Sequence, residues 1–354
     1  MYYAGIDAHA KYLRIAVVNK VGGEIVAEKQ IASRDTVALI EFLARYEGIE
    51  VVVETCPFWP WIQQVLEGAG IPFHLAHSRE LRAIAHHPQK NDKVDARLLA
   101  RMLGARLIPP AWPRSRQQRE WLRLLRHRVS LVRQRTQVAN RIHSQLHQQG
   151  LSLPREQLLR QSGQQWLKTD AWPNLDPEQR RIVRTHLRLI RWLSQTIRGL
   201  DRPIRTAAEK NADVELLRSI TGVGPFWGLM LVAELLPITR FPNAAKFVSY
   251  CGLAPRTSSS GGHTHYGSVP KEANRWVRWA IVSATATHVQ RLPEGRLAQS
   301  YERLKDRIGW KKARIATARR LAYAIYAMLK THTPWREMEP VHREDELQQA
   351  HVGC

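Results

Sequence analysis

Acidic residues are scarce in this sequence, and long hydrophobic runs are absent. The chain of 354 residues has 31 Asp and Glu against 54 Lys and Arg, which gives a net charge of +23 at pH 7. A positive excess of this size attracts polyanions, and nucleic acids are the commonest polyanions that proteins bind. No apolar run approaches the roughly 20 residues that cross a bilayer, so a membrane-spanning protein is excluded. No signal peptide is expected either, because residues 2–8 already form a strand pattern.

Cysteine is scarce too, and its spacing excludes two kinds of site. Cys56, Cys251 and Cys354 lie far apart in the sequence. They form neither the CxxC spacing of zinc sites nor a disulfide framework, so we expect a reducing, intracellular compartment. The sequence also lacks a GxxxxGK[ST] phosphate loop. Together with the basic charge, this absence argues against an ATPase of the sugar-kinase type.

The first 108 residues alternate between short β-rich runs and amphipathic helical patterns. Strand patterns cover residues 2–10, 12–19, 22–32, 49–57 and 71–77, and helical patterns cover residues 35–48, 61–70 and 90–100. Three strands precede the first helix, and strands and helices then alternate. This order predicts an α/β domain with a mixed sheet over residues 1–108.

A proline-rich stretch at Pro109, Pro110 and Pro113 then changes the composition. It predicts a separate basic, helical segment over residues 109–212. Apolar residues there recur at spacings of three and four, which indicates an antiparallel helical pair or an oligomerising coiled coil. The first seam contains Leu122, Leu125, Val129, Val132, Thr136, Ala139, His143 and Leu146, and the second contains Val183, His186, Ile190, Leu193, Ile197 and Leu200.

Arginines line the first of these helices. Arg126 and Arg133 belong to a group of eight arginines between residues 114 and 135, and the acid within that stretch is Glu120. A solvated helix face normally mixes both signs of charge. We therefore favour contact with nucleic-acid phosphates over a purely solvated face.

Residues 213–332 predict a third, mostly α-helical domain. Around Gly222 and Gly224 two helices are joined by a short turn, a helix-hairpin-helix-like element whose backbone N–H groups suit a phosphate. A polar, glycine-rich loop over residues 252–271 follows, and helical patterns return at residues 274–289, 296–309 and 311–331. Residues 333–354 are expected to form a polar tail.

Four acidic positions fall on or beside buried elements of the α/β domain. Asp7 lies on the first strand, Glu54 ends a buried strand, and Asp92 and Asp95 lie three residues apart in one helical pattern. Acids so spaced repel each other on a helix face. The structural interpretation is that Asp92 caps the helix and both acids favour its first turn. The functional interpretation is a shared cation, and oxygen ligands without His or Cys select Mg²⁺ or Mn²⁺.

A strand Asp, a strand Glu and a helical Asp pair occur in this order in the ribonuclease H-like (RuvC-like) fold. The chain resembles the DEDD transposases of the insertion sequence 110 type. The N-terminal likeness rests on "GIDAHA", "VVVETCP" and "KNDKVDARLLA", and the C-terminal likeness on "LRSITGVGP", "YCGLAPRTSSSGG" and "GSVPKEANRWVR". The resemblance implies a transposase that cuts and rejoins DNA, with Asp7, Glu54, Asp92 and Asp95 as catalytic ligands of Mg²⁺.

The resemblance also implies that a serine in the glycine-rich loop is the nucleophile. Ser258, Ser259 and Ser260 are the candidates, and Ser260 fits the family pattern because a glycine follows it directly. The product would be a phosphoserine link and a free 3′-hydroxyl. Metal-assisted activation of the serine is favoured over His263 or His265 as a general base. The family's lysine, any residue, glycine and asparagine is here "KEAN", so the glycine is missing.

Four basic residues that flank this loop could hold phosphates, although surface solubility explains them equally well. They are Arg256, Lys271, Arg275 and Arg278. The family further implies a structured guide RNA encoded by the element, DNA at the element ends and target, and homodimers or tetramers. It also implies a cytoplasmic, nucleoid-associated protein of a prokaryote.

Two other functions stay open at this point. One is a RuvC-like, metal-dependent junction-resolving nuclease, in which water attacks the phosphodiester and no covalent intermediate forms. The other is a non-catalytic nucleic-acid-binding protein, in which the buried acids would only cost stability.

Overall fold

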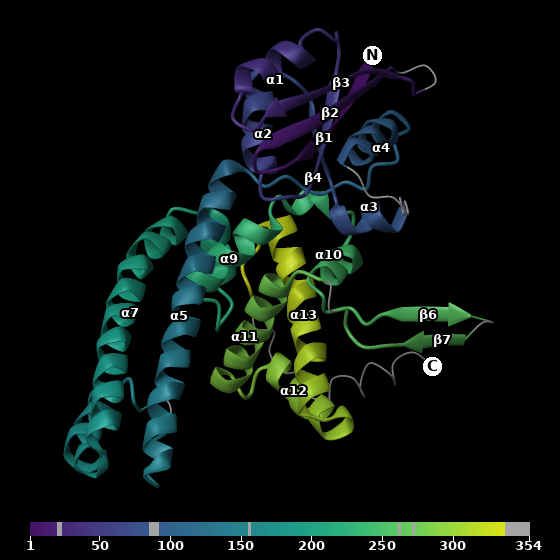
Figure 1. The fold of residues 1–354 in the computed structure, drawn as a ribbon. Coiled ribbons are helices and arrows are strands. Elements are labelled where there is room, and N and C mark those ends of the chain that lie inside the picture. The colour runs from purple at the N-terminus through teal and green to yellow at the C-terminus, as the bar shows by residue number, and fades with distance from the viewer. Residues whose placement is uncertain (20–22, 85–91, 155–156, 261–262, 271–272, 337–354) are drawn as a thin grey trace, which may run out of the picture. The chain divides into compact units, whose positions relative to one another are not determined.

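The proline-rich stretch around Pro109 and Pro110 precedes a division of the chain into two units. In the computed structural model these are Met1–Arg114, the sheet unit, and Ser115–Cys354, the helical unit. The structure describes residues 1–19, 23–84, 92–154, 157–260, 263–270 and 273–336, and of residues 82–84, 92–94, 257–260 and 263–266 the backbone alone. Figure 1 shows the elements of both units. The predicted division into segments 1–108, 109–212, 213–332 and 333–354 stays a prediction.

The sheet unit is built on a five-stranded mixed sheet in the order β3-β2-β1-β4-β5. Its strands are β1 (Tyr2–Ala8), β2 (Tyr12–Asn19), β3 (Ile25–Ala32), β4 (Glu50–Glu54) and β5 (Phe73–Ala76). The first three strands are antiparallel neighbours, whereas β4 runs parallel to both β1 and β5. The predicted mixed α/β sheet is therefore confirmed. Its strand order is compatible with a ribonuclease H-like domain.

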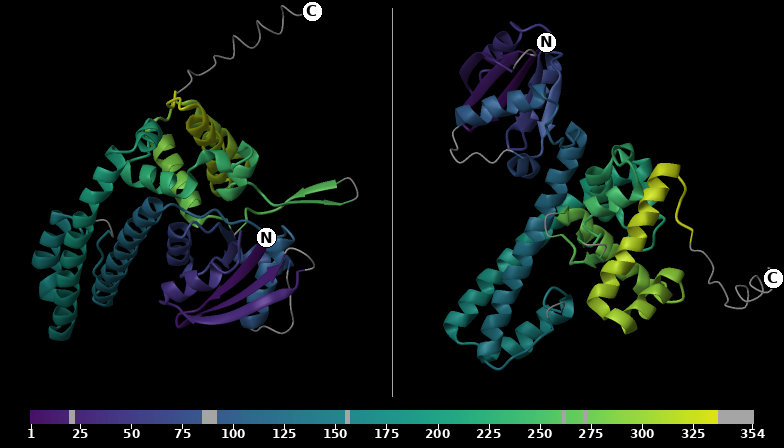
Figure 2. Two further views of the ribbon diagram at one scale, coloured as in Figure 1. Left: turned by 90° about the horizontal axis from the view of Figure 1, so that it is seen from above. Right: turned by 90° about the vertical axis from the view of Figure 1, so that its right-hand side faces the viewer.

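Helices cover both faces of this sheet, because alternate residues of the central strands are apolar on either side. The helices are α1 (Thr36–Leu43), α2 (Trp59–Gly68), α3 (Ser78–Ile84) and α4 (Asp92–Gly104). Ile6 and Val53 face a core that includes residues of α1 and α2. Tyr3 and Val52 face the opposite core with Leu99 and Leu103 of α4. Figure 2 shows the sheet with α4 against one face.

Gly5 sets how closely α4 approaches β1. A Cβ atom at Gly5 would lie 2.2 Å from the carbonyl oxygen of Ala96 and 2.6 Å from the nitrogen of Ala100. Both are backbone atoms, so they cannot rotate away as the end of a side chain can. Glycine at this position therefore lets the helix backbone rest directly on the strand.

In the helical unit, α5 (Arg116–Gln148) and α7 (Pro177–Glu209) pack side by side and antiparallel (Figure 1). At one end the Gln149 side chain donates to Gln179 at the start of α7, over 2.8 Å. Farther along the pair Arg128 of α5 binds Asp201, late in α7. Both helices begin with a capping box, Ser115 with Gln118 and Asp176 with Gln179, which satisfies backbone N–H groups that the first turn leaves unpaired.

The predicted heptad seam of α5 is only partly correct, because α5 packs against two different partners along its length. Leu122 and Leu125 belong to the core of the C-terminal helices, and Thr136 is exposed. The core shared with α7 uses Ile142, which the heptad spacing missed. From α5 it contains Leu131, Val138, Ala139, Ile142 and Leu146, and from α7 Val183, Ile190, Leu193 and Ile197. The antiparallel pair is therefore present, while the oligomerising coiled coil stays a prediction.

Short helical turns connect α5 to α7, and seven helical elements follow α7 among the residues that the structure describes. The connection contains α6 (Gln161–Trp166), η1 (Leu167–Ala171) and η2 (Trp172–Asn174). The C-terminal elements are α8 (Ala212–Arg218), α9 (Pro225–Leu235), η3 (Ile238–Arg240), α10 (Ala244–Tyr250), α11 (Arg275–Arg291), α12 (Arg296–Ile308) and α13 (Trp310–Thr331). Within the described part of the chain, no helix has both the length and the apolar character that a membrane crossing requires.

The turn between α8 and α9, the predicted helix-hairpin-helix-like element, packs against α11. Gly222 has a φ of +103°, and a Cβ there would lie 2.6 Å from the Ala284 carbonyl oxygen. The Nδ1 atom of His288 also lies 3.0 Å from the Thr221 carbonyl oxygen. One side of this turn is therefore occupied by the protein itself.

The segment expected to be a glycine-rich loop is a β-hairpin. Its strands β6 (Thr257–Ser260) and β7 (His263–Tyr266) pair antiparallel, and the hairpin extends away from the helices of its unit (Figure 1). The loop prediction was wrong because the serines, threonines and histidines show no apolar alternation, the usual sign of a strand. Residues 261–262 lie outside the described residues.

Replacing Gly5 by alanine tests the contact between α4 and β1. We expect Gly5→Ala to lower the free energy of unfolding of the sheet unit by about 1–3 kcal/mol, because the added methyl group overpacks a backbone contact. Urea denaturation measures the change, and faster hydrogen exchange in α4 would place it. Gly68→Ala is the matched control, since no atom lies within 4 Å of its Cβ position. Equal stability of the two variants would contradict the argument.

Candidate active site

Asp7 and Glu54 occupy neighbouring positions at the same end of the sheet. The parallel pairing of β1 and β4 matches Ile6 with Val53, so Asp7 and Glu54 are the next residues along the two strands. Asp7 shares a sheet face with Tyr3 and Gly5, and Glu54 shares it with Val52. This is the face that α4 covers. Both acids are partly buried, so the predicted convergence of two strand carboxylates agrees with the strand register.

The start of α4 lies at this end of the sheet as well. Ala96 lies over Gly5, and Gly104 lies over Tyr3, so α4 runs opposite to β1. Four residues of helix and two residues of strand both span about 6 Å. The first turn of α4 is therefore level with Asp7. Asp95 directly precedes Ala96, and the backbone of Asp92 begins the helix, while the side chain of Asp92 lies outside the described residues.

An ion pair fixes α4 on the sheet beside these acids. The guanidinium of Arg97 binds Glu28 of β3, with 2.9 Å between Nη2 and Oε2. Glu28 lies opposite Ala16 of β2, on the face that α4 covers. The helix is thus held to β3 by charge and to β1 by close backbone contact, which keeps its first turn in place.

Polar side chains surround Asp7. Its Oδ2 lies 2.9 Å from Nε2 of His9, and its partner across the antiparallel β1–β2 pair is Arg14. Burial raises the pKa of the Cys56 thiol, and the negative charges of Glu54 and Asp7 raise it further. One thiol therefore senses both carboxylates, which supports their proximity. Sequence reasoning missed His9 and Arg14, although both lie within seven residues of Asp7.

The donor atoms suit a hard cation, because Asp7, Glu54 and Asp95 supply carboxylate oxygens alone. Among the described side chains, however, no group of three or more His, Cys, Asp or Glu residues lies close enough to hold a metal ion. Asp92 is not among those side chains. A metal site at this end of the sheet is therefore a matter for proposal.

The candidate nucleophiles lie on the β-hairpin of the helical unit. The strand register pairs Ser260 with His263, Ser259 with Thr264, and Ser258 with His265. Ser260 is the last residue of β6, next to the turn of the hairpin. The side chains of this hairpin lie outside the described residues, so the register gives positions only.

The base of the hairpin is anchored to α10 and α11. The backbones of Arg256 and Gly267 extend the pairing, with 2.7 Å between the Gly267 nitrogen and the Arg256 oxygen. Arg278 of α11 donates a hydrogen bond to the Pro270 carbonyl oxygen. A Cβ at Gly252 would lie 2.3 Å from Nη2 of Arg278. Arg278 therefore donates to the chain that follows the hairpin and lies close to Gly252, which precedes it, while its role toward nucleic acid stays a prediction.

Asn274 links this region to a buried acid that sequence reasoning missed. Its Oδ1 accepts from the backbone N–H groups of Trp276 and Val277 and so caps α11. Its Nδ2 donates to Oε2 of Glu234 over 2.9 Å and to the Tyr250 hydroxyl over 3.1 Å. Asn274 is the asparagine of the "KEAN" motif. Asn274 therefore caps α11 although the family's glycine is absent from the motif.

Glu234 is only 1% exposed and binds Arg126 through Oε1. Arg126, predicted to contact nucleic acid, thus ties α5 to α9 by an ion pair whose acid is buried, although the Arg126 side chain itself is 40% exposed. The other predicted contacts differ in their surroundings. Arg256, Arg275 and Arg133 are exposed, and Lys271 lies outside the described residues.

The sheet with acids gathered at one end, followed by a basic helical unit, is compatible with the ribonuclease H-like class of DNA-processing proteins. Comparison with known families agrees. The sequence model of an insertion sequence 110 DEDD transposase matches residues 4–150, and that of the "Transposase IS116/IS110/IS902 family" matches residues 214–302. The chain belongs to this family of insertion-sequence transposases.

Individual relatives are also named as transposases of insertion sequences, and the chain matches most of their length. The chain is 24% identical over 289 residues to "Transposase for insertion sequence element IS1111A" of Coxiella burnetii (strain RSA 493 / Nine Mile phase I), covering 81% of this chain and 79% of that protein. It is 24% identical over 304 residues to "Transposase for insertion sequence element IS1328" of Yersinia enterocolitica, covering 83% and 86%.

Removing Glu234 tests its structural role. We expect Glu234→Ala to lower the free energy of unfolding by about 1–3 kcal/mol, because it removes the acceptor of both Arg126 and the Asn274 amide. Glu215→Ala removes an exposed partner of Arg218, and the expected loss is below about 1 kcal/mol. Thermal and urea denaturation measure both variants. A loss no larger for Glu234→Ala than for Glu215→Ala would contradict the role assigned to Glu234.

Proposed function

We propose that the protein cuts and rejoins the DNA strands of an insertion sequence through a covalent phosphoserine intermediate. The observation that carries the proposal is the register of β1 and β4, together with the antiparallel course of α4 over Gly5. In support of the proposal, Asp7 and Glu54 follow paired residues of two neighbouring strands, and Asp95 belongs to the first turn of α4. Membership of a transposase family supports DNA as the substrate.

The carboxylates of Asp7, Glu54, Asp92 and Asp95 would hold Mg²⁺ or Mn²⁺. When bound, such an ion offsets the negative charge of the phosphate and lowers the pKa of an attacking hydroxyl. The residues themselves supply oxygen donors from two strands and one helix. The fixed position of α4 would orient them before substrate arrives.

Ser260 is the proposed nucleophile. Its Oγ would bond to phosphorus, the bond from phosphorus to the 3′-oxygen would break, and the serine proton would leave while the departing oxygen gains a proton. A phosphoserine ester and a free 3′-hydroxyl result. Attack by another strand's 3′-hydroxyl on that ester reverses the step. The bond energy is retained, so no ATP is needed.

The partners beyond DNA are also proposals. A structured RNA encoded by the element would guide the protein to its donor and target DNA, held through backbone and shape contacts with basic residues such as Arg256, Lys271 and Arg275. Dimers or tetramers would bring the serine of one subunit to the carboxylates of another. The protein would work in the cytoplasm of a prokaryote, at the nucleoid.

Ser260→Ala tests the nucleophile. Purified protein is mixed with element ends, Mg²⁺ and transcripts of the DNA that flanks the gene, and denaturing gels detect protein–DNA adducts. We expect the wild-type chain to form an adduct and Ser260→Ala to form none. Ser258→Ala and Ser259→Ala are the controls, and both should retain the adduct. An adduct at normal yield in Ser260→Ala would reject this serine.

Asp7→Asn and Glu54→Gln test the carboxylates. We expect each to reduce strand cleavage by about 100-fold or more, and to weaken Mn²⁺ binding measured by calorimetry, because each removes a charged oxygen donor. Glu41→Gln, on the exposed surface of α1, should change neither quantity. Unchanged Mn²⁺ binding in both site variants, or full cleavage in EDTA, would reject the metal site.

A junction-resolving nuclease of the same fold is the alternative enzyme. Water would then attack, and products would carry hydrolysed ends without any adduct. Hydrolysis that survives Ser260→Ala and requires Asp7 would favour this alternative. Undiminished DNA binding with no cleavage under any of these conditions would favour a non-catalytic binding protein.

A further inference from the structure

Four aromatic residues form a continuous row on the helical unit. Phe226 and Trp227 begin α9, and Trp276 and Trp279 lie one turn apart on α11. The ring centroids of Trp227 and Trp279 are 4.7 Å apart, those of Phe226 and Trp227 are 4.9 Å apart, and those of Trp276 and Trp279 are 6.1 Å apart. We call these four residues the aromatic row.

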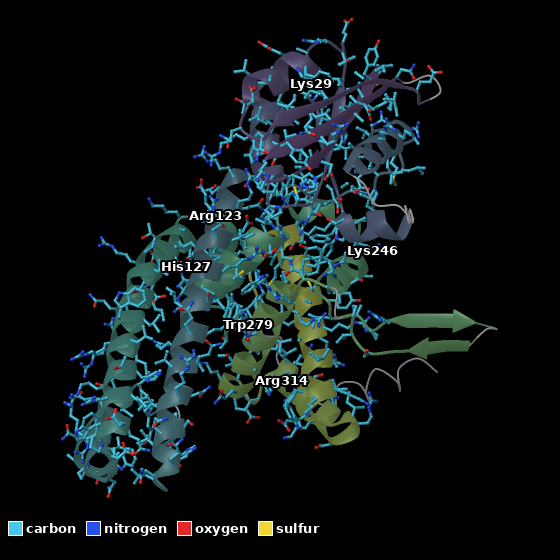
Figure 3. The ribbon with its side chains drawn as sticks, viewed as in Figure 1. Lys29, Arg123, His127, Lys246, Trp279 and Arg314 are labelled. Atoms are coloured by element: carbon cyan, nitrogen blue, oxygen red, sulfur yellow. The ribbon has the colours of Figure 1, made fainter. Side chains whose placement is uncertain are left out.

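One ring of the aromatic row is open to solvent. Trp279 is 40% exposed, while the other three rings are partly buried at the edge of the core. Beside Trp279 lies a hollow of about 580 Å³, whose lining includes Val129, Val132 and Thr136 of α5. Figure 3 shows Trp279 on α11, on the side toward α5. A large flat ring is thus presented where a flat ligand could lie against it.

Arginines surround the same rings. The Arg133 guanidinium lies 5.7 Å from the centroid of Trp276 and 6.0 Å from that of Trp279. Arg275 lies 5.5 Å from the Trp276 centroid, and Arg128 lies 5.1 Å from that of Phe226. Within the described part of the chain, neither Arg133 nor Arg275 pairs with a carboxylate. Their charges are available to an anion beside the rings.

Further positive charge is concentrated on this stretch of α5 and α7. Burial lowers the pKa of Arg135, and the neighbouring charges of Arg128 and Arg198 lower it further, against the opposing effect of Asp201. Three arginines therefore lie close enough to influence one another. An anionic partner would relieve this repulsion.

We propose that the aromatic row binds an unpaired stretch of DNA, with a base stacked on Trp279 and the adjoining phosphates on Arg133 and Arg275. A base inside a duplex has both faces covered by its neighbours, so an exposed ring can stack only on a base that has left the helix. Stacking on aromatic rings within a basic groove is the usual way in which proteins hold single strands. Strand exchange between two DNA molecules must expose such bases.

This inference deepens the proposed function, since it rests on DNA being the substrate. The position of the aromatic row in the sequence fits a role in DNA binding next to the serine hairpin. Arg275 and Trp276 directly follow Asn274, the cap of α11, and Arg278 on the same helix binds the base of the serine hairpin. The helix that presents the aromatic row therefore also anchors the segment proposed to attack DNA.

The test compares binding of two labelled DNA duplexes that differ in one feature. One contains a run of unpaired thymidines, and the other is fully paired. Fluorescence anisotropy of the full-length protein should show that Trp279→Leu weakens binding of the looped duplex about tenfold, the size expected from losing one base–aromatic stack. Binding of the paired duplex should change less than about twofold, and Trp279→Phe should retain most of the affinity.

Trp192→Leu is the matched control. Trp192 lies on α7 and is 58% exposed, so its removal costs little stability and should leave both affinities unchanged. A second measurement gives the position directly. Thymidines replaced by 5-iodo-2′-deoxyuridine in the loop should crosslink, on irradiation, to the α11 peptide that contains Trp279.

Several outcomes would overturn the inference. One is that Trp279→Leu weakens the affinity for both duplexes equally, and another is that it weakens neither. A third is that the affinity falls only for an RNA copy of the loop. A fourth is that light scattering shows a changed oligomeric state while the DNA affinity stays intact. The proposed catalytic function is judged separately by the Ser260 adduct. A wild-type chain that forms the adduct normally but binds the looped and the paired duplex equally well would reject the stacking site alone.

Discussion

The close backbone contact of α4 with β1 at Gly5 determines how the first turn of α4 lies relative to the acidic residues of the sheet. An added methyl group at Gly5 would collide with the Ala96 carbonyl oxygen, which it would approach to 2.2 Å. With that contact in place, the antiparallel course of α4 brings its first turn level with Asp7. The parallel register of β4 adds Glu54 on the same face. The missing side chain of Gly5 therefore lets the first turn of α4 lie level with Asp7.

In the helical unit the excess charge is positive, because arginines predominate there. The buried acid Glu234 accepts from Arg126 of α5 and from Asn274, which caps α11. An ion pair of this kind has a large desolvation cost, so it adds little stability over an apolar contact but is costly to break. The value of Glu234 lies in geometry, since its two contacts fix α5 and the start of α11 relative to α9.

The sequence predicted the elements that local patterns specify and missed those that depend on distant residues. Alternation and helical spacing were sufficient for the five strands, the mixed sheet and the placement of Asp7 and Glu54. The β6–β7 hairpin was missed because its polar residues form strands through backbone pairing rather than through burial of one face. The Arg126–Glu234 pair joins residues 108 positions apart, which no local pattern reveals. The heptad seam was only partly correct because the first part of α5 packs against the C-terminal helices and the rest against α7.

The arginines of α5 fall into two groups that sequence alone could not separate. Arg126 and Arg128 are matched by Glu234 and Asp201, so much of their charge is used within the protein. Arg133 lies beside Trp276 and Trp279 instead of a carboxylate. A guanidinium over a ring keeps its full charge while its flat face is covered, and so it can still bind a phosphate at its edge. Net charge thus indicates that the chain binds a polyanion, but the pairing of each arginine decides where.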